Sequence, residues 1–118
     1  MVKGHGSAKE GTGHFWLQRV TAIAMIPLVL WLCFSIASLP GMTHAEIREW
    51  LSQPFTAVLM ILLILTGFFH AKLGIQVVIE DYISNHGTRT AAIIATTLGF
   101  ALLAVLGVFS VMRIAFTA

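Results

Sequence analysis

Three stretches of the chain carry no charged residue, and polar residues gather between them. Residues 20–45, 50–71 and 90–112 contain no Asp, Glu, Lys or Arg. About 20 apolar residues in an α-helix cross a hydrocarbon core of roughly 30 Å, and a helix satisfies its own backbone hydrogen bonds there. The pattern predicts an all-α integral membrane protein with three transmembrane helices, at about residues 20–39, 55–79 and 90–116.

The remaining residues form an amino-terminal arm and short connections. Residues 1–19 are the arm, and residues 20–118 are the three-helix domain. Pro40 and Gly41 are a stop signal for the first helix. Thr43 and Glu46 have the spacing of a capping box, which favours a short amphipathic turn at the membrane interface with Trp50 in the headgroup layer. An ordinary loop is an equally good interpretation of this segment.

Composition agrees with a protein dissolved in lipid. Of 118 residues, 58% are hydrophobic and 10% charged, and the mean hydropathy is +0.90. A water-soluble domain does not have this balance. The net charge of +2 reflects residues that flank the helices and does not suggest nucleic acid. The single Cys33 excludes a disulfide within the chain and is assigned to packing.

Basic residues indicate the orientation. Lys3, Lys9, Arg19, Lys72 and Arg89 lie on the side of the amino terminus, and Arg48 and Arg113 on the other. The five basic residues on the first side, against two on the other, favour an amino terminus in the cytoplasm. The arm has no apolar core or cleavage site of a signal peptide, and it is too poor in Arg and Ser for a transit peptide. A bacterial inner membrane is therefore favoured over a mitochondrial one.

His70 is an ionisable residue inside an apolar segment. If Glu80, ten residues later, marks the interface, His70 lies about 15 Å inside the membrane, near the midplane. Imidazole cannot reach water from there, so His70 needs a partner within the membrane. Position alone gives equal weight to a functional site and to a hydrogen bond with a neighbouring helix.

Small residues flank His70 on its helix face. At about 100° per residue, this face is shared by Leu63, Thr66, Gly67, Gly74, Val77 and Asp81. Gly67 and Gly74 leave space for a flat macrocycle or for a close helix, and both explanations stay open. Gly99 and Gly107 in the third helix are assigned to helix packing.

A haem held by two histidines would need a second imidazole at the depth of His70. His5 and His14 belong to the arm, His44 to the external side and His86 to the cytoplasmic connection. A second ligand would then have to come from another polypeptide. Arg19, with His14 five residues before it, stands at the level expected for the propionates, although an arginine there also serves as a topology anchor.

Two segments carry a resemblance to a known family. Residues 14–22, His-Phe-Trp-Leu-Gln-Arg-Val-Thr-Ala, and residues 70–82, which begin His-Ala-Lys-Leu-Gly and end Glu-Asp-Tyr, resemble the small membrane-anchor subunits of succinate dehydrogenase, respiratory complex II. The second segment, H-x₃-G-x₆-D-Y, is the more specific. The resemblance extends over the whole chain, including its length and its three helices.

The resemblance assigns roles to particular residues. It makes His70 an axial ligand of a b-type haem whose other ligand lies on a larger anchor subunit. It places Tyr82 at a ubiquinone site, with its hydroxyl on a quinone carbonyl and Asp81 in support. Arg19 matches the arginine near the haem propionates, and His14 is a weaker match that could instead face the iron-sulfur subunit.

The resemblance also implies partners. They are a larger cytochrome b anchor, whose three helices pack with these around the haem, an iron-sulfur subunit and a flavoprotein that holds FAD. The four would form a heterotetramer, which can assemble as a trimer of heterotetramers. The complex would pass electrons from succinate to ubiquinone in the tricarboxylic acid cycle. This chain has no glycine loop for a nucleotide and no cysteine cluster, so we expect no succinate oxidation by it alone.

Other interpretations compete with this one. An anchor of a quinol:fumarate reductase would differ in the direction of catalysis, which the sequence barely separates. A small transporter or proton-conducting protein would use His70, Lys72 and Glu80, but the first and third helices have no buried charge to continue a pathway. A purely structural anchor is the simplest alternative. Tyr82 alone could be an interfacial tyrosine, and Asp81 a solvated charge that ends its helix.

Overall fold

The computed structural model describes the backbone of residues 2–117 and the side chains of residues 12–117. In this range the chain forms four helices and no strand: α1 (Val2–Ala37), α2 (His44–Ser52), α3 (Pro54–Tyr82) and α4 (His86–Thr117). α1 from Thr12, α3 and α4 are long and apolar enough to cross a membrane. The expected all-α class with three membrane spans is confirmed. The side chains of Lys3, His5 and Lys9 lie outside the described residues.

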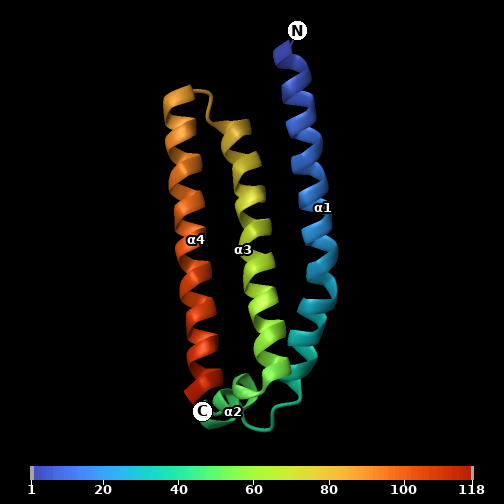
Figure 1. Cartoon of the computed structure of the whole chain (residues 1–118), viewed down its shortest axis with the longest axis vertical. Coiled ribbons are helices and arrows are strands. Elements are labelled where there is room, and N and C mark those ends of the chain that lie inside the picture. The colour runs from blue at the N-terminus through green and yellow to red at the C-terminus, as the bar shows by residue number, and fades with distance from the viewer. Residues whose placement is uncertain (1, 118) are drawn as a thin grey trace.

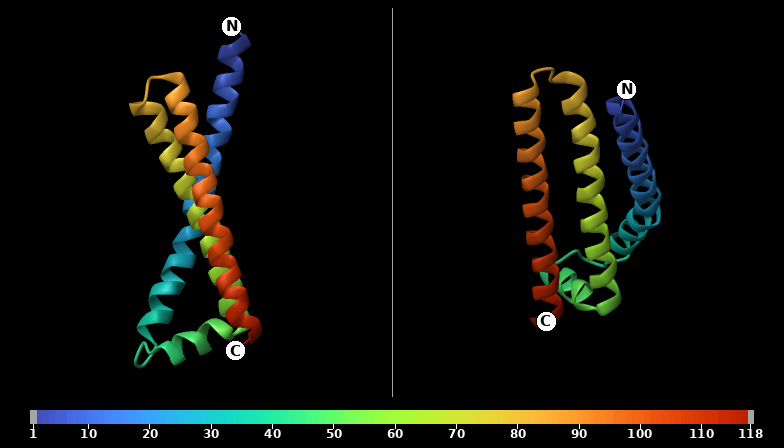
Figure 2. Two further views of the ribbon diagram at one scale, coloured as in Figure 1. Left: turned by 90° about the vertical axis from the view of Figure 1, so that its left-hand side faces the viewer. Right: turned by 45° about the horizontal axis from the view of Figure 1, so that its top comes forward.

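The three long helices stand in a row. α3 lies between α1 and α4 and contacts both, whereas α1 and α4 do not contact each other in the described part of the chain. α2 lies across the end opposite the amino terminus, as Figure 1 shows. Figure 2 shows α1 crossing α3 and curving along its length; α1 contains Pro27, which has no N–H for the helix ladder.

A row of three helices buries little side-chain surface by itself. Among residues 12–117, the buried side chains are Thr56, Ala57, Leu73, Ile79 and Val111. Large apolar side chains such as Phe34 and Phe116 are 74% and 81% exposed. Exposed apolar surface on this scale requires lipid or other subunits to cover it.

The helices are longer than the hydrophobic pattern predicts. α1 begins at Val2 and ends at Ala37, instead of running from residue 20 to 39, so most of the arm is an extension of the first span. Each residue added to an existing helix gains one backbone hydrogen bond, and no new helix has to be nucleated. α3 continues past residue 79 to Tyr82, which places Asp81 and Tyr82 in its last turn.

α4 begins at His86, ahead of the predicted residue 90. Asn85 explains the earlier start, because its Oδ1 accepts a hydrogen bond from the Thr88 backbone N–H at 3.0 Å and so caps the helix. Arg89 Nε donates to the Ile83 carbonyl oxygen at 3.0 Å and ties the loop between α3 and α4 to the new helix.

The segment before α3 is a helix and not an irregular loop. α2 starts after Thr43, whose side chain accepts from the Glu46 N–H while Glu46 accepts from the Thr43 N–H, so the predicted capping box is confirmed. Glu46 Oε2 also accepts from the Gly41 N–H at 3.0 Å. These hydrogen bonds lower the pKa of Glu46, with the Thr43 backbone N–H as the largest cause.

Aromatic stacking attaches α2 to the first span. The rings of Trp31 in α1 and Trp50 in α2 have centroids 5.8 Å apart and planes 24° apart. Trp50 is half-buried. Stacking of this kind stabilises the pair by about 0.5–1.5 kcal/mol beyond its buried area, and it holds α2 against the end of the row.

The glycines of α4 divide into two kinds. A Cβ at Gly107 would lie 3.3 Å from Ile64 Cδ1 and Cγ2, so α3 and α4 pack closely there. A Cβ at Gly99 would have nothing within 4 Å. The packing assignment therefore holds for Gly107 and is wrong for Gly99 within this chain. Cys33, also assigned to packing, is exposed because its face of α1 lies against no other helix of the described chain.

Candidate functional site

His70 lies in the middle of α3 and faces α1. Its Nδ1 is 2.8 Å from Thr21 Oγ1, a hydrogen bond between residues 49 positions apart. His70 and Thr21 are both half-buried. The partner that an intramembrane imidazole needs is therefore a hydroxyl on the neighbouring helix.

The hydrogen bonds of Thr21 determine which nitrogen of His70 carries the proton. Thr21 Oγ1 lies 2.7 Å from the Leu17 carbonyl oxygen and 3.1 Å from that of Gln18. A threonine hydroxyl has one proton, and these carbonyls take it. Thr21 Oγ1 therefore accepts from His70 Nδ1–H, and the tautomer assigned by this network leaves a lone pair on Nε2. Metal-bound histidines commonly have this arrangement, because the second ring nitrogen donates to a fixed acceptor.

The small residues around His70 line the contact between α3 and α1. A Cβ at Gly67 would lie 3.9 Å from Met25 Cε, and one at Gly74 would lie 3.7 Å from Gln18 Nε2. Both are ordinary contact distances. Both glycines therefore face side chains of α1, although the two backbones are not in close contact there. Neither glycine adds side-chain bulk beside His70.

Two buried polar atoms on the face of α1 that meets α3 have no hydrogen-bond partner. Of the buried side-chain nitrogens and oxygens in the described range, only His14 Nε2 and Gln18 Oε1 are unpaired. His14 and Gln18 lie one turn apart on α1 and line a pocket of about 450 Å³ with Phe15, Gly74 and Val77. Because an unpaired buried polar atom is costly, these two atoms are available to water or to a polar group from outside the chain.

Arg19 does not belong to this pocket. It is exposed, and its guanidinium carbon lies 4.8 Å from the centre of the Phe15 ring. Successive helical residues are about 100° apart, so Arg19 points to a different side of α1 from Gln18. The structure thus brings His14 to the α1–α3 face and leaves Arg19 directed to lipid or to another subunit.

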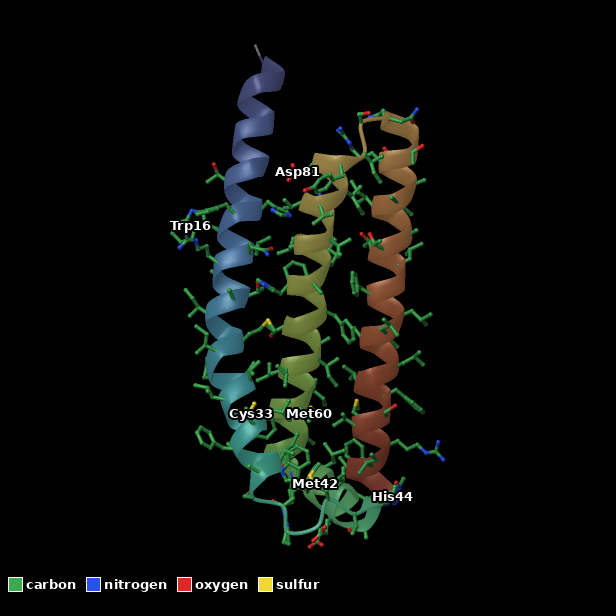
Figure 3. The ribbon with its side chains drawn as sticks, turned by 180° about the vertical axis from the view of Figure 1, so that it is seen from behind. Trp16, Cys33, Met42, His44, Met60 and Asp81 are labelled. Atoms are coloured by element: carbon green, nitrogen blue, oxygen red, sulfur yellow. The ribbon has the colours of Figure 1, made fainter. Side chains whose placement is uncertain are left out.

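Tyr82 and Asp81 lie in the last turn of α3, at the same end as the amino terminus. Tyr82 is 83% exposed and Asp81 is also exposed. Figure 3 shows Asp81 at the end of α3, and Trp16 on the outer side of α1. Neither Tyr82 nor Asp81 makes a side-chain hydrogen bond within the described residues, so both are available to a substrate or a partner.

The donor set agrees with one axial position of a haem. In the described range no group of three His, Cys, Asp or Glu residues is placed to hold a metal ion. A haem supplies four ring nitrogens itself and needs only axial ligands from protein. His70, with a lone pair on Nε2, has the form that such a ligand requires. On the same face of α1, a protonated His14 Nε2 and the amide nitrogen of Gln18 are donors that a carboxylate can accept from.

Comparison with known proteins separates the membrane-anchor interpretation from the transporter interpretation. The family model described as succinate dehydrogenase/fumarate reductase transmembrane subunit matches residues 2–109. The chain belongs to this family. The match favours the anchor interpretation over a transporter, because the family is named for a transmembrane subunit of these enzymes.

Individual relatives of the succinate dehydrogenase anchor type agree over most of the chain. The hydrophobic membrane anchor subunit of Rickettsia bellii (strain RML369-C) is 42% identical over 98 residues, which cover 82% of this chain and 78% of the relative. That of Paracoccus denitrificans is 34% identical over 104 residues, 87% and 80% of the two chains. The membrane anchor subunit of Reclinomonas americana is 31% identical over 88 residues, 72% and 73% of the two chains.

The chain is accordingly a multi-pass membrane anchor subunit of the succinate dehydrogenase type. It is part of an oxidoreductase complex, so other subunits are available to cover the exposed faces of the helix row. The relatives from Rickettsia and Paracoccus suggest that the membrane is a bacterial one.

Sequence reasoning missed two residues of the site. Thr21 and Gln18 both lie in the segment that carries the resemblance, but nothing marks their contacts with His70 and Gly74. One signal was present: Gln18, Thr21 and Met25 recur at helical spacing, as do His70, Gly74 and Gly67 on α3. The pairing of the two faces becomes visible only when the helices are placed together.

Proposed function

We propose that this anchor subunit contributes His70 as one axial ligand of a b-type haem, shared with a larger anchor subunit that supplies the second ligand. The observation that carries the proposal is the hydrogen bond from His70 Nδ1–H to Thr21, which leaves Nε2 with a lone pair. The bound haem would supply a one-electron redox centre inside the membrane. No second histidine lies at this depth among residues 12–117, which supports a shared site.

The residues beside His70 would orient the group. Thr21 fixes the plane and tautomer of the imidazole. His14, whose Nε2 is buried and unpaired, would donate to a propionate at the α1–α3 pocket, and Gln18 would do so through its amide nitrogen. Arg19, exposed on the adjacent side of α1, would reach a propionate only from the partner's side of the interface.

Tyr82 and Asp81 would form part of a ubiquinone site where the membrane and soluble parts of the complex meet. A phenol hydroxyl can donate to a quinone oxygen as negative charge develops there, and a nearby carboxylate can hold the geometry or pass a proton. The exposure of both side chains supports this role. The amino terminus would then face the cytoplasm, with an iron-sulfur subunit and an FAD-containing flavoprotein on that side.

In this arrangement succinate is oxidised in the soluble subunits, and ubiquinone is reduced beside Tyr82, a step shared by the respiratory chain and the tricarboxylic acid cycle. The relatives are succinate dehydrogenase subunits, which favours succinate oxidation over fumarate reduction as the physiological direction.

The test is a reduced-minus-oxidised optical spectrum of the purified complex. We expect a b-type haem spectrum that disappears in His70→Ala. His86→Ala is the matched control, because His86 is an exposed histidine at the start of α4 and should leave the spectrum unchanged. A normal spectrum in His70→Ala would remove His70 from the haem.

A further inference from the structure

Two arginines from different helices line the same pocket at the α2 end of the molecule. Arg48 of α2 and Arg113 of α4 line one pocket of about 470 Å³ with Phe109, Ser110, Ile114 and Thr117. Arg48 is half-buried and Arg113 is exposed. This pocket lies at the opposite end of the row from Tyr82 and has no part in the proposed haem or quinone sites.

The positive charge of this pocket is not balanced within the described chain. Neither Arg48 nor Arg113 forms an ion pair with any carboxylate of residues 12–117. Arg48 Nη2 makes one hydrogen bond, a long one of 3.4 Å to Thr117 Oγ1. Glu46, on the same helix as Arg48, instead accepts from Gly41 and Thr43. Two guanidinium groups in one pocket repel each other unless an anion lies between them.

The hydroxyl groups of the pocket leave recognition to the arginines. Ser110 Oγ donates to the Leu106 carbonyl oxygen at 2.8 Å, and Thr117 Oγ1 donates to that of Arg113. Their protons are therefore used inside α4. The remaining donors are the guanidinium N–H groups, whose planar fork matches two oxygens of a phosphate or a carboxylate.

The depth of the pocket narrows the choice of anion. α2 lies across the end of the membrane spans (Figure 1), and Trp50, two residues after Arg48, stacks on Trp31. Tryptophan is enriched at the headgroup level of a bilayer. Phe109, 61% exposed, and Ile114 border the pocket from the membrane-spanning part of α4. A ligand here would have a charged head and an apolar tail.

We propose that Arg48 and Arg113 bind the phosphate of an anionic membrane phospholipid, with the start of an acyl chain against Phe109 and Ile114. The lipid would join α2 to α4 and neutralise the pair of charges. The anion chemistry alone would also suit free phosphate, but the apolar border and the headgroup depth select the lipid.

Titration of the purified, delipidated complex with dioctanoyl phosphatidylglycerol, read by native mass spectrometry, tests this site. We expect binding that weakens roughly tenfold or more in the Arg48→Gln/Arg113→Gln double variant, because two charge-assisted contacts are lost. The Arg48→Lys/Arg113→Lys variant should retain most of the affinity, since it retains the charge. Dioctanoyl phosphatidylcholine, which has no net charge, should bind clearly more weakly than phosphatidylglycerol.

Several outcomes would overturn the proposal. Equal affinity for phosphatidylglycerol in the wild type and the double Gln variant would do so, and so would equal binding of the two lipids. Displacement of the lipid by an equal concentration of inorganic phosphate would assign the pocket to a free anion. Loss of a protein subunit from the double variant with unchanged lipid binding would assign the arginines to a partner carboxylate. If the double variant does not assemble, Arg113→Gln alone serves, because this exposed side chain makes no hydrogen bond within residues 12–117; unchanged affinity there would equally contradict the site.

Discussion

Thr21 Oγ1 lies 2.8 Å from His70 Nδ1 and at the same time bonds the carbonyl oxygen of Leu17 at 2.7 Å. The threonine hydroxyl thus connects the backbone of α1 to the imidazole on α3 through two hydrogen bonds. One hydroxyl holds the ring plane and determines that Nε2 is the nitrogen with the lone pair. The arrangement gives His70 the form that an axial ligand needs before any cofactor arrives.

Thr21→Val should retain the haem but change its redox potential. Valine has the shape of threonine without the acceptor, so His70 loses its hydrogen bond and becomes a weaker electron donor to the oxidised iron. We expect the midpoint potential of the haem, measured by redox titration of the optical spectrum, to rise by tens of mV, on the order of what one hydrogen bond supplies to a one-electron couple.

Thr96→Val is the matched control for Thr21→Val. Thr96 also bonds its own helix, at 2.9 Å to the Ala92 carbonyl oxygen, but it makes no contact with a histidine. The midpoint potential of the haem in Thr96→Val should stay at the wild-type value. An unchanged potential in Thr21→Val, or an equal shift in Thr96→Val, would show that the hydroxyl does not act through His70.

Tyr82→Phe should lower ubiquinone reduction and leave the haem content intact. The change removes one hydroxyl from an exposed position, so we expect no loss of fold. Loss of a hydrogen bond made to the developing quinone anion should reduce kcat/KM for ubiquinone by roughly tenfold. Steady-state assays of succinate:ubiquinone reductase activity in the purified complex measure this kcat/KM.

Trp16→Phe controls for the loss of an exposed aromatic polar group near the same end of the molecule. Trp16 is 61% exposed and points outward from α1 (Figure 3). Its ubiquinone kinetics should match the wild type. Normal kinetics in Tyr82→Phe would place the quinone elsewhere and leave Tyr82 as an interfacial tyrosine.

Gly107→Val should destabilise the contact between α3 and α4. The new side chain would meet Ile64, already 3.3 Å from the position of a Cβ, and overpacking of this kind costs about 1–3 kcal/mol. Thermal denaturation of the complex should show a lower midpoint for Gly107→Val. Gly99→Val makes the same change where nothing lies within 4 Å, and it should lower the midpoint much less. An equal drop of the thermal midpoint in the two variants would contradict the close contact between α3 and α4 at Gly107.

The cap of α2 should weaken in acid. Its hydrogen bonds lower the pKa of Glu46 in the folded protein, so their contribution is present above the unfolded-state pKa and is lost as pH falls through the lowered one. Hydrogen exchange at the Gly41 and Thr43 amides, corrected for the intrinsic rate, should lose protection over that acidic range. Glu46→Gln should remove the pH dependence, whereas Glu49→Gln, an exposed change on the same helix, should retain it. Constant protection down to the acid limit would contradict the role of the carboxylate.

The sequence predicted those features that lipid and local geometry impose. The charge-free stretches predicted the three spans, because an apolar run of about 20 residues crosses a bilayer as a helix that satisfies its own backbone. Thr43 and Glu46 predicted the cap of α2, because a capping box depends on four consecutive residues. The face of His70 was also readable, because helical spacing determines it. Asn85 was a readable signal too, although the prediction for α4 did not use it.

Features that depend on how helices pair could not be predicted in the same way. The Thr21 contact needs the register of α1 against α3, and the unpaired atoms of His14 and Gln18 become visible only when that register is known. Gly99 and Gly107 look alike in sequence, yet only Gly107 meets another helix. The length of α1 was underestimated because four glycines among residues 4–13 favour a flexible arm, whereas the span behind them continues as a helix.

Electron paramagnetic resonance of the oxidised complex tests the central claim, that the imidazole of His70 is bound to haem iron. His70→Gly should lose the low-spin signal of a haem with two imidazole ligands, and added imidazole, which fits the space left by the side chain, should restore that signal. The His86→Gly complex should keep the signal throughout. A wild-type low-spin signal in His70→Gly without added imidazole would contradict the account.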